Sequence, residues 1–112
     1  MVIRELAPNI SVGAQINPEV LKSLAERGFT DIVCNRPDSE HPDGPVSEEV
    51  AKAAFDLGLT FHYLPIDPDE EPETQSAALA HIMAKPDRRI FAYCRTGGRS
   101  TMACKKTTVC TP

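Results

Sequence analysis

Short apolar segments alternate with helix-forming segments along this chain, and this alternation restricts its fold more than any other feature. Strand-like and helical segments follow one another in the order 9–12, 17–28, 29–34, 47–57, 59–66, 74–84 and 90–93. Strands that alternate with helices in this way form one sheet with the helices packed on its faces. We therefore predict an α/β fold with a central, mainly parallel sheet of four to five strands flanked by helices.

The ends of the helical segments carry recognisable signals. Asn17 is expected to cap a helix that has Pro18 in its first turn, and Gly28 is expected to end it. A last helix should begin at Ser100, but the two lysines and the β-branched residues that follow support little more than two turns. We predict a single domain over residues 1–112, with 107–112 as an irregular tail.

Composition excludes several classes of function. A net charge of −4 argues against a general nucleic-acid binder, which would carry a basic face. No apolar run reaches the length of a membrane span, and the first residues lack a signal-peptide pattern. The four cysteines show neither disulfide-framework nor metal-ligand spacing. We expect a cytoplasmic protein without a metal or cofactor.

One loop carries the clearest sign of chemistry. The run Ile90–Tyr93 predicts a buried strand that stops at Cys94, and glycines in the next residues allow a tight turn. Backbone N–H groups and a helix start at Ser100 would form an anion site, whose field also favours thiolate at Cys94. Arg95, Thr96, Gly97, Gly98 and Arg99 are the expected anion-binding residues, with the planar guanidinium of Arg99 suited to an oxyanion. A cysteine here could instead be a small buried residue.

Loops after two other strands should reach the same edge of the sheet, because ligands bind beyond the carboxyl ends of parallel strands. Arg36 and Asp38 follow one strand, and they either contact the ligand or pair with each other across the turn at Pro37. Asp67 and Asp69 follow the next strand, in an acidic turn that could equally be a solvated loop.

Three segments give the chain a resemblance to a known family: Cys34-Asn35-Arg36-Pro37-Asp38, the strand 58–66, and the loop 94–100. Together they resemble the phosphatase-like domain of bacterial beta-lactamase hydrolase-like proteins, which is related in fold to dual-specificity phosphatases. The loop also resembles that of single-domain rhodaneses. The resemblance implies that Cys94 is the nucleophile and Arg99 the oxyanion binder. It also implies a metallo-hydrolase domain as a partner, because family relatives are sometimes fused to one.

Three functions follow from this reading. The first is a phosphatase acting on a phosphomonoester through phosphocysteine, with Ser100 stabilising the departing thiolate. Asp67 is the first candidate for its general acid and Asp69 the second. The second is a rhodanese-type sulfurtransferase, which the four residues between Cys94 and Arg99 favour, since phosphatases have five. The third is a binding module whose catalysis is impaired by the unusual C-terminal segment. In the two enzymatic readings the ligand is a small anion.

Overall fold

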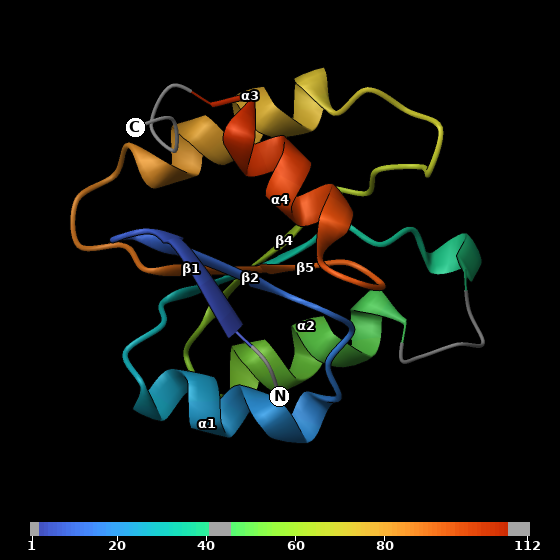
Figure 1. Cartoon of the computed structure of the whole chain (residues 1–112). Helices are drawn as coiled ribbons and strands as arrows, with labels where there is room; N and C mark the ends of the chain where they lie inside the picture. The colour runs from blue at the N-terminus through green and yellow to red at the C-terminus, as the bar shows by residue number, and fades with distance from the viewer. Residues whose placement is uncertain (1–2, 41–45, 108–112) are drawn as a thin grey trace.

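A computed structural model describes residues 3–40 and 46–107 of the chain, and its centre is a five-stranded sheet (Figure 1). The strands are β1 (Ile3–Ala7), β2 (Ile10–Gly13), β3 (Asp31–Cys34), β4 (Thr60–Tyr63) and β5 (Ile90–Tyr93), arranged in the order β1-β2-β5-β3-β4. Strand β1 is antiparallel to β2, and all other pairs are parallel. The predicted α/β fold with a mainly parallel sheet is therefore confirmed.

Two helices cover each face of the sheet. Helices α1 (Leu21–Glu26) and α2 (Ser47–Asp56) lie on one face, and α3 (Glu73–Met83) and α4 (Gly98–Lys105) lie on the other (Figure 1). Two short 3-10 helices, η1 (Pro18–Val20) and η2 (Asp38–Glu40), lie in the connections after β2 and β3. None of the helices in the described ranges is long and apolar enough to cross a membrane.

Alternation along the central strand β5 divides the apolar residues between two cores. Ile90 and Ala92 join the cluster under α3 and α4, whereas Phe91 and Tyr93 join the cluster over α1 and α2. All four side chains are fully buried, and burying one large apolar side chain contributes about 1.5–3 kcal/mol. Strand β5 is thus held from both faces, which fixes the position of the residue that follows it, Cys94.

Several predicted boundaries differ from the structure. Strand β1 was not predicted, because its exposed residues Arg4 and Glu5 interrupt any apolar run. Asn17 makes no side-chain cap hydrogen bond, since the chain enters α1 through the 3-10 turn η1. Helix α4 begins at Gly98, two residues before Ser100.

The short last helix agrees with its predicted length of about two turns. Of the predicted irregular tail 107–112, only Thr107 lies within the described residues. Thr107 is buried, and its hydroxyl donates to the Cys104 carbonyl at 2.7 Å. Residues 108–112 lie outside the described part of the chain.

Candidate active site

Cys94 lies at the carboxyl end of β5, where the chain turns into α4. Its N–H donates to the Gly13 carbonyl at the end of the neighbouring strand β2, at 3.4 Å. Its sulfur accepts a hydrogen bond from the Gly97 N–H at 3.0 Å. Cys94 has no exposed surface, so its sulfur sits at the base of the loop rather than at its rim.

The loop backbone favours the thiolate form of Cys94. Burial of the thiol raises its pKa, but the N–H groups of Ser100, Thr96, Arg99 and Gly97 lower the pKa by donating to the sulfur. The second effect prevails, and the pKa of Cys94 lies below the ordinary thiol value. Backbone donors at the start of α4 therefore converge on a negatively charged sulfur, as an anion site at a helix N-terminus requires.

Gly97 allows this convergence for two reasons. Its φ of 94° lies in the left-handed region, where a side chain is strained. A Cβ atom at this position would also lie 3.3 Å from both the carbonyl carbon and the carbonyl oxygen of Gly13. The loop 94–100 thus rests on the end of β2 so closely that a side chain at position 97 would crowd the Gly13 backbone.

Glu40 holds Arg99 in place. Nη1 of Arg99 donates to Oε2 of Glu40 at 2.6 Å, and Nη2 donates to Oε1 at 2.8 Å. Nη1 also donates to the Ile66 carbonyl at 2.7 Å. Glu40 and Arg99 are largely buried, with side chains 19% and 18% exposed. The sequence reading missed Glu40, although the residue shares the loop after β3 with Arg36 and Asp38.

Arg99 keeps donors for a ligand despite these contacts. A guanidinium has five N–H groups, and the three hydrogen bonds to Glu40 and Ile66 use two on Nη1 and one on Nη2. The remaining donors, on Nε and Nη2, form one edge of the group, and the side chain also hydrogen-bonds to the Cys94 sulfur. This edge has the geometry that binds two oxygens of an oxyanion together. The hydrogen bond that Arg99 donates to Glu40 raises the pKa of Arg99 most, and the Cys94 sulfur also raises it, so the guanidinium lies close to the thiolate.

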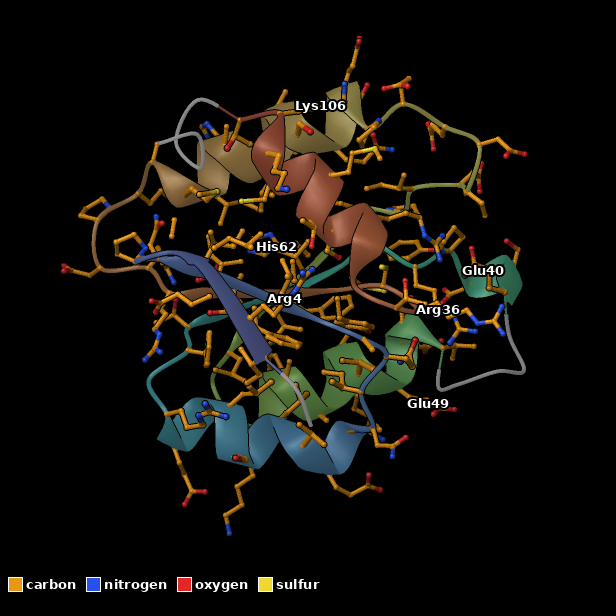
Figure 2. All side chains as sticks on the ribbon, in the orientation of Figure 1. Arg4, Arg36, Glu40, Glu49, His62 and Lys106 are labelled. Carbon is orange, nitrogen blue, oxygen red and sulfur yellow. The ribbon has the colours of Figure 1, made fainter. Side chains whose placement is uncertain are left out.

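Arg36 and Asp38 do not pair with each other, so the predicted brace across Pro37 is wrong. Arg36 is buried, and its Nη1 donates to Oε1 of Gln15 at 2.8 Å. Its Nη2 donates to the Glu40 carbonyl at 2.9 Å, and its Nε lies 3.4 Å from Oε1 of Glu40 (Figure 2). Arg36 therefore fixes the short helix η2 from which Glu40 reaches Arg99.

Asp38 binds the first residue of α2 instead. Its carboxylate accepts from the backbone N–H and from the hydroxyl of Ser47, both at 2.7 Å. A carboxylate at this position satisfies an unpaired N–H and complements the positive end of the helix dipole. Asp38 therefore holds the loop after β3 against the start of α2.

The Ser100 side chain points to a partner other than the sulfur. Its hydroxyl donates to Oδ1 of Asn35 at 2.8 Å, and both residues are buried. The Asn35 amide in turn donates to the Leu64 carbonyl at 2.9 Å. This chain of contacts ties α4 to the ends of β3 and β4, while the Ser100 backbone N–H is one of the donors to Cys94.

The candidate acids lie at the rim of the site. Asp67 follows Ile66, whose carbonyl binds Arg99, so its backbone is adjacent to the guanidinium. The Asp67 N–H donates to Oε1 of Glu70 at 3.0 Å, and Asp67 and Asp69 are exposed. Arg95 and Thr96 are exposed on the loop after β5. Within residues 3–40 and 46–107, no cluster of His, Cys, Asp or Glu could hold a metal ion.

Known proteins with a similar sequence are beta-lactamase hydrolase-like proteins. One from Xylella fastidiosa strain Temecula1 is 26% identical over 102 residues, which are 91% of this chain and 24% of that protein. The chain thus spans about a quarter of the length of the curated relatives it matches.

Solved phosphatase structures have a similar fold. A provisionally assigned phosphatase from Neisseria meningitidis Z2491 matches 92% of this chain and 73% of its own, with a TM-score of 0.81 and 25% identity. The core catalytic domain of the PP-IP phosphatase Siw14 from S. cerevisiae matches 85% of this chain and 56% of its own, with a TM-score of 0.65. At 18% identity, the likeness to Siw14 concerns the fold alone.

The sequence profile of one family matches nearly the whole chain. This profile describes the phosphatase-like domain of beta-lactamase hydrolase-like protein, and it matches residues 2–108. The match includes the strand ends and the loop that surround Cys94. The chain therefore belongs to the family of beta-lactamase hydrolase-like phosphatase-like domains.

Proposed function

We propose that this chain is a cysteine-dependent phosphatase that hydrolyses a phosphomonoester through Cys94. One observation carries the proposal: four backbone N–H groups lower the pKa of a thiol beside a guanidinium whose Nε–Nη2 edge is not bound to Glu40 or Ile66 and has the geometry to bind an oxyanion. Family membership and the phosphatase-like fold support the same chemistry.

The reaction has two displacements at phosphorus. In the first, the Cys94 thiolate forms an S–P bond while the P–O bond to the leaving group breaks. Loop N–H groups and Arg99 bind the equatorial oxygens, whose negative charge they stabilise. In the second, a water molecule attacks the phosphocysteine, the S–P bond breaks, and inorganic phosphate leaves. The thiolate departs from phosphorus into the donors that stabilise it, among them the Ser100 N–H.

Asp67 is the proposed general acid of the first step. Its backbone is joined to Ile66, so its carboxyl group lies on the segment that contacts Arg99. It would donate a proton to the departing alcohol oxygen and take one from water in the second step. Asp69, two residues further along the exposed turn, is the second candidate.

The buried position of Cys94 adds a requirement. Since the sulfur has no exposed surface, an opening movement of the groups around it must precede attack. The segments that surround the loop are the turn 66–70, η2, and the β2–α1 connection, which bonds to the loop through Gln15 N–H and the Arg95 carbonyl at 3.3 Å.

A sulfurtransferase remains the second candidate, because only four residues separate Cys94 from Arg99. In that reaction the thiolate takes the outer sulfur of thiosulfate and releases sulfite. The resulting persulfide then gives its sulfur to cyanide and forms thiocyanate. This chemistry needs the same thiolate and anion site but no general acid.

One comparison separates these functions. Freshly reduced protein is assayed for release of p-nitrophenol from p-nitrophenyl phosphate and for formation of thiocyanate from thiosulfate and cyanide. We expect the first activity, and we expect its loss in Cys94→Ser, whereas Cys34→Ser retains it. Activity that persists in Cys94→Ser would refute the proposed mechanism. Thiocyanate formation alone would assign the sulfurtransferase, and a lack of both activities would favour the impaired binding module.

A further inference from the structure

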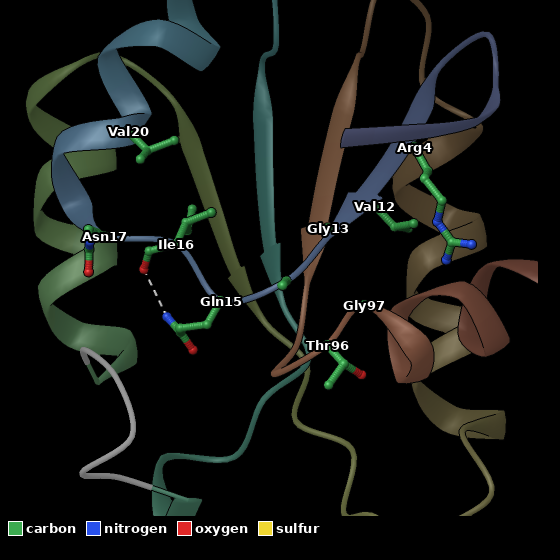
Figure 3. A pocket seen from close by; sticks show the side chains of 10 residues that line it. Arg4, Val12, Gly13, Gln15, Ile16, Asn17, Val20, Thr96 and Gly97 are labelled. Atoms are coloured by element: carbon green, nitrogen blue, oxygen red, sulfur yellow. Dashed lines mark hydrogen bonds between the residues drawn. The ribbon is translucent and has the colours of Figure 1, made fainter. Parts of the chain in front are cut away.

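A cavity of about 410 Å³ adjoins the catalytic loop (Figure 3). Thr96 and Gly97 form one part of its wall, and the Gly97 N–H is one of the groups that donate to the Cys94 sulfur. The remaining wall comes from β1, the end of β2, and the connection that leads to η1. The lining residues are Arg4, Val12, Gly13, Ala14, Gln15, Ile16, Asn17, Val20, Thr96 and Gly97.

The size of this cavity suits a small molecule. Ligand sites in proteins commonly have volumes of about 300–1,000 Å³. A molecule in this cavity would touch the loop that binds the phosphate, because Gly97 belongs to both. The cavity is therefore placed to hold the organic part of a substrate whose phosphate lies over Cys94.

The charge of the cavity differs from that of the whole chain. Although the chain has a net charge of −4, no aspartate or glutamate is among the lining residues. Arg4 brings a positive charge, and no ion pair within the described ranges involves it. Its Nη2 donates to the Thr101 hydroxyl at 2.7 Å, which holds the guanidinium beside the start of α4.

Polar amides and small apolar groups complete the lining. Gln15 is held by two contacts. Its Nε2 donates to the Ile16 carbonyl at 2.9 Å (Figure 3), and its Oε1 accepts from Arg36. The Asn17 side chain makes no cap hydrogen bond, so its donor and acceptor are not committed to η1. Val12 and Val20 supply apolar surface for a short carbon skeleton.

We propose that this cavity binds the leaving-group end of a small organic phosphomonoester that carries a second anionic group, with Arg4 as the residue that recognises that group. The proposal rests on the proposed function, because it takes the phosphate to lie on the loop at Cys94. The second anion is a carboxylate or a further phosphate, both of which match the two-oxygen geometry of a guanidinium.

The test uses two probes that share a carbon skeleton. 3-Phosphoglycerate and glycerol 3-phosphate differ in that the first has a carboxylate where the second has a hydroxymethyl group. Their dissociation constants are measured by isothermal titration calorimetry at low ionic strength with the non-turnover variant Cys94→Ser. We expect 3-phosphoglycerate to bind about fivefold tighter, as befits one partly exposed ion pair.

Substitutions of the lining residues identify which side chain causes the preference for 3-phosphoglycerate. Arg4→Gln should reduce the ratio of the two dissociation constants to about one, and Arg4→Lys should retain part of it. Asn17→Asp, which places a carboxylate in the cavity without touching the Thr101 contact, should also reduce the ratio. Arg27→Gln is the matched control, because this exposed residue follows α1 and is not among the lining residues.

The outcomes separate this inference from the proposed function. Equal binding of the two probes, absence of binding by either, or a preference that survives in Arg4→Gln overturns the inference. If Arg4→Gln does not fold, Asn17→Asp alone tests the inference. An unchanged ratio of the two dissociation constants in that variant also overturns it. Turnover of p-nitrophenyl phosphate through Cys94, together with equal binding of the two probes, would support the phosphatase and refute the role of the cavity. A preference for 3-phosphoglycerate that depends on Arg4, without turnover of p-nitrophenyl phosphate, would support the role of the cavity in binding and argue against the phosphatase.

Discussion

Glu40 and Arg99 are 59 residues apart in the chain and are joined by two hydrogen bonds of 2.6 and 2.8 Å. The contact connects η2, after β3, with the first turn of α4, after β5. A third element takes part, since Arg99 also donates to the Ile66 carbonyl after β4. The orientation of the Arg99 guanidinium is thus set by loops from two other strands.

Glu40→Gln should weaken both the fold and the site. Glutamine keeps one acceptor but loses the charge, so we expect the free energy of unfolding to fall by about 1–2 kcal/mol. Arg99 would then hold its position less firmly, and kcat for p-nitrophenyl phosphate should fall about tenfold. Urea denaturation and steady-state kinetics measure these effects. The control is Glu48→Gln, at an exposed position in the first turn of α2. It should change the free energy of unfolding and kcat only slightly.

The stabilising effect of Glu40 should depend on pH in a defined direction. The Arg99 hydrogen bond lowers the pKa of Glu40 most, against a smaller opposing effect of burial. A group with a lowered folded-state pKa stabilises fully above its unfolded pKa, about 4.3 for Glu, and loses this contribution as pH falls through the folded value. The stability difference between wild type and Glu40→Gln should therefore be full near pH 7 and shrink in acid. A constant difference would contradict the ion pair.

Gly97→Ala should disturb the thiolate, whereas Gly58→Ala should not. Both glycines have positive φ, but a Cβ at Gly97 would crowd the Gly13 backbone, and a Cβ at Gly58 would meet nothing within 4 Å. We expect a loss of about 2–3 kcal/mol for Gly97→Ala and about 1 kcal/mol for Gly58→Ala. Only the first should raise the pKa of Cys94, because it displaces the N–H that donates to the sulfur. Equal shifts in both variants would argue against this role of the loop.

Cys94 and Cys34 should differ in their reaction with iodoacetamide. Backbone donors outweigh burial and lower the pKa of Cys94, whereas burial is the largest effect on Cys34 and raises its pKa. Alkylation of Cys94 should have its midpoint at a lower pH than that of an ordinary thiol measured in the same buffer, and Cys34 should remain unmodified at that pH. Mass spectrometry of the modified peptides across pH distinguishes the two residues. Preferential labelling of Cys34 would contradict the assignment.

The Ser100–Asn35 hydrogen bond should contribute to stability as a pair. Ser100→Ala leaves the buried Oδ1 of Asn35 without its donor, which costs about 1–3 kcal/mol. A double-mutant cycle with Asn35→Ala isolates the contact, and we expect a coupling energy of about 1 kcal/mol. Additive effects of the two changes would mean that the contact contributes nothing of its own.

Asp67→Asn tests the general acid by comparing leaving groups. Phenolate is a poor leaving group that needs a proton, whereas p-nitrophenolate departs without one. The variant should lose about 10²-fold in kcat with phenyl phosphate and much less with p-nitrophenyl phosphate. Asp69→Asn is the matched control in the same exposed turn. If Asp69→Asn shows the selective loss instead, the role belongs to that residue.

The sequence was sufficient for features that depend on local pattern. The apolar run Ile90–Tyr93 and the glycines after Cys94 predicted the central strand and the tight loop, because burial and backbone freedom act on neighbouring residues. Contacts between distant segments were not readable in this way. Nothing in the sequence around Glu40 indicates Arg99 as its partner, and the Arg36–Asp38 pairing failed because both side chains reach beyond their own loop, to Gln15 and to Ser47.

The enclosed position of the Cys94 sulfur has a consequence for its chemical durability. Thiolates are the form of cysteine that peroxide oxidises, and susceptibility rises with exposure as well as with charge. Here the charge is favoured while the exposed surface is absent, so an oxidant can reach the sulfur only if the groups around it move apart. The same enclosure that delays a substrate would then preserve the nucleophile between turnovers.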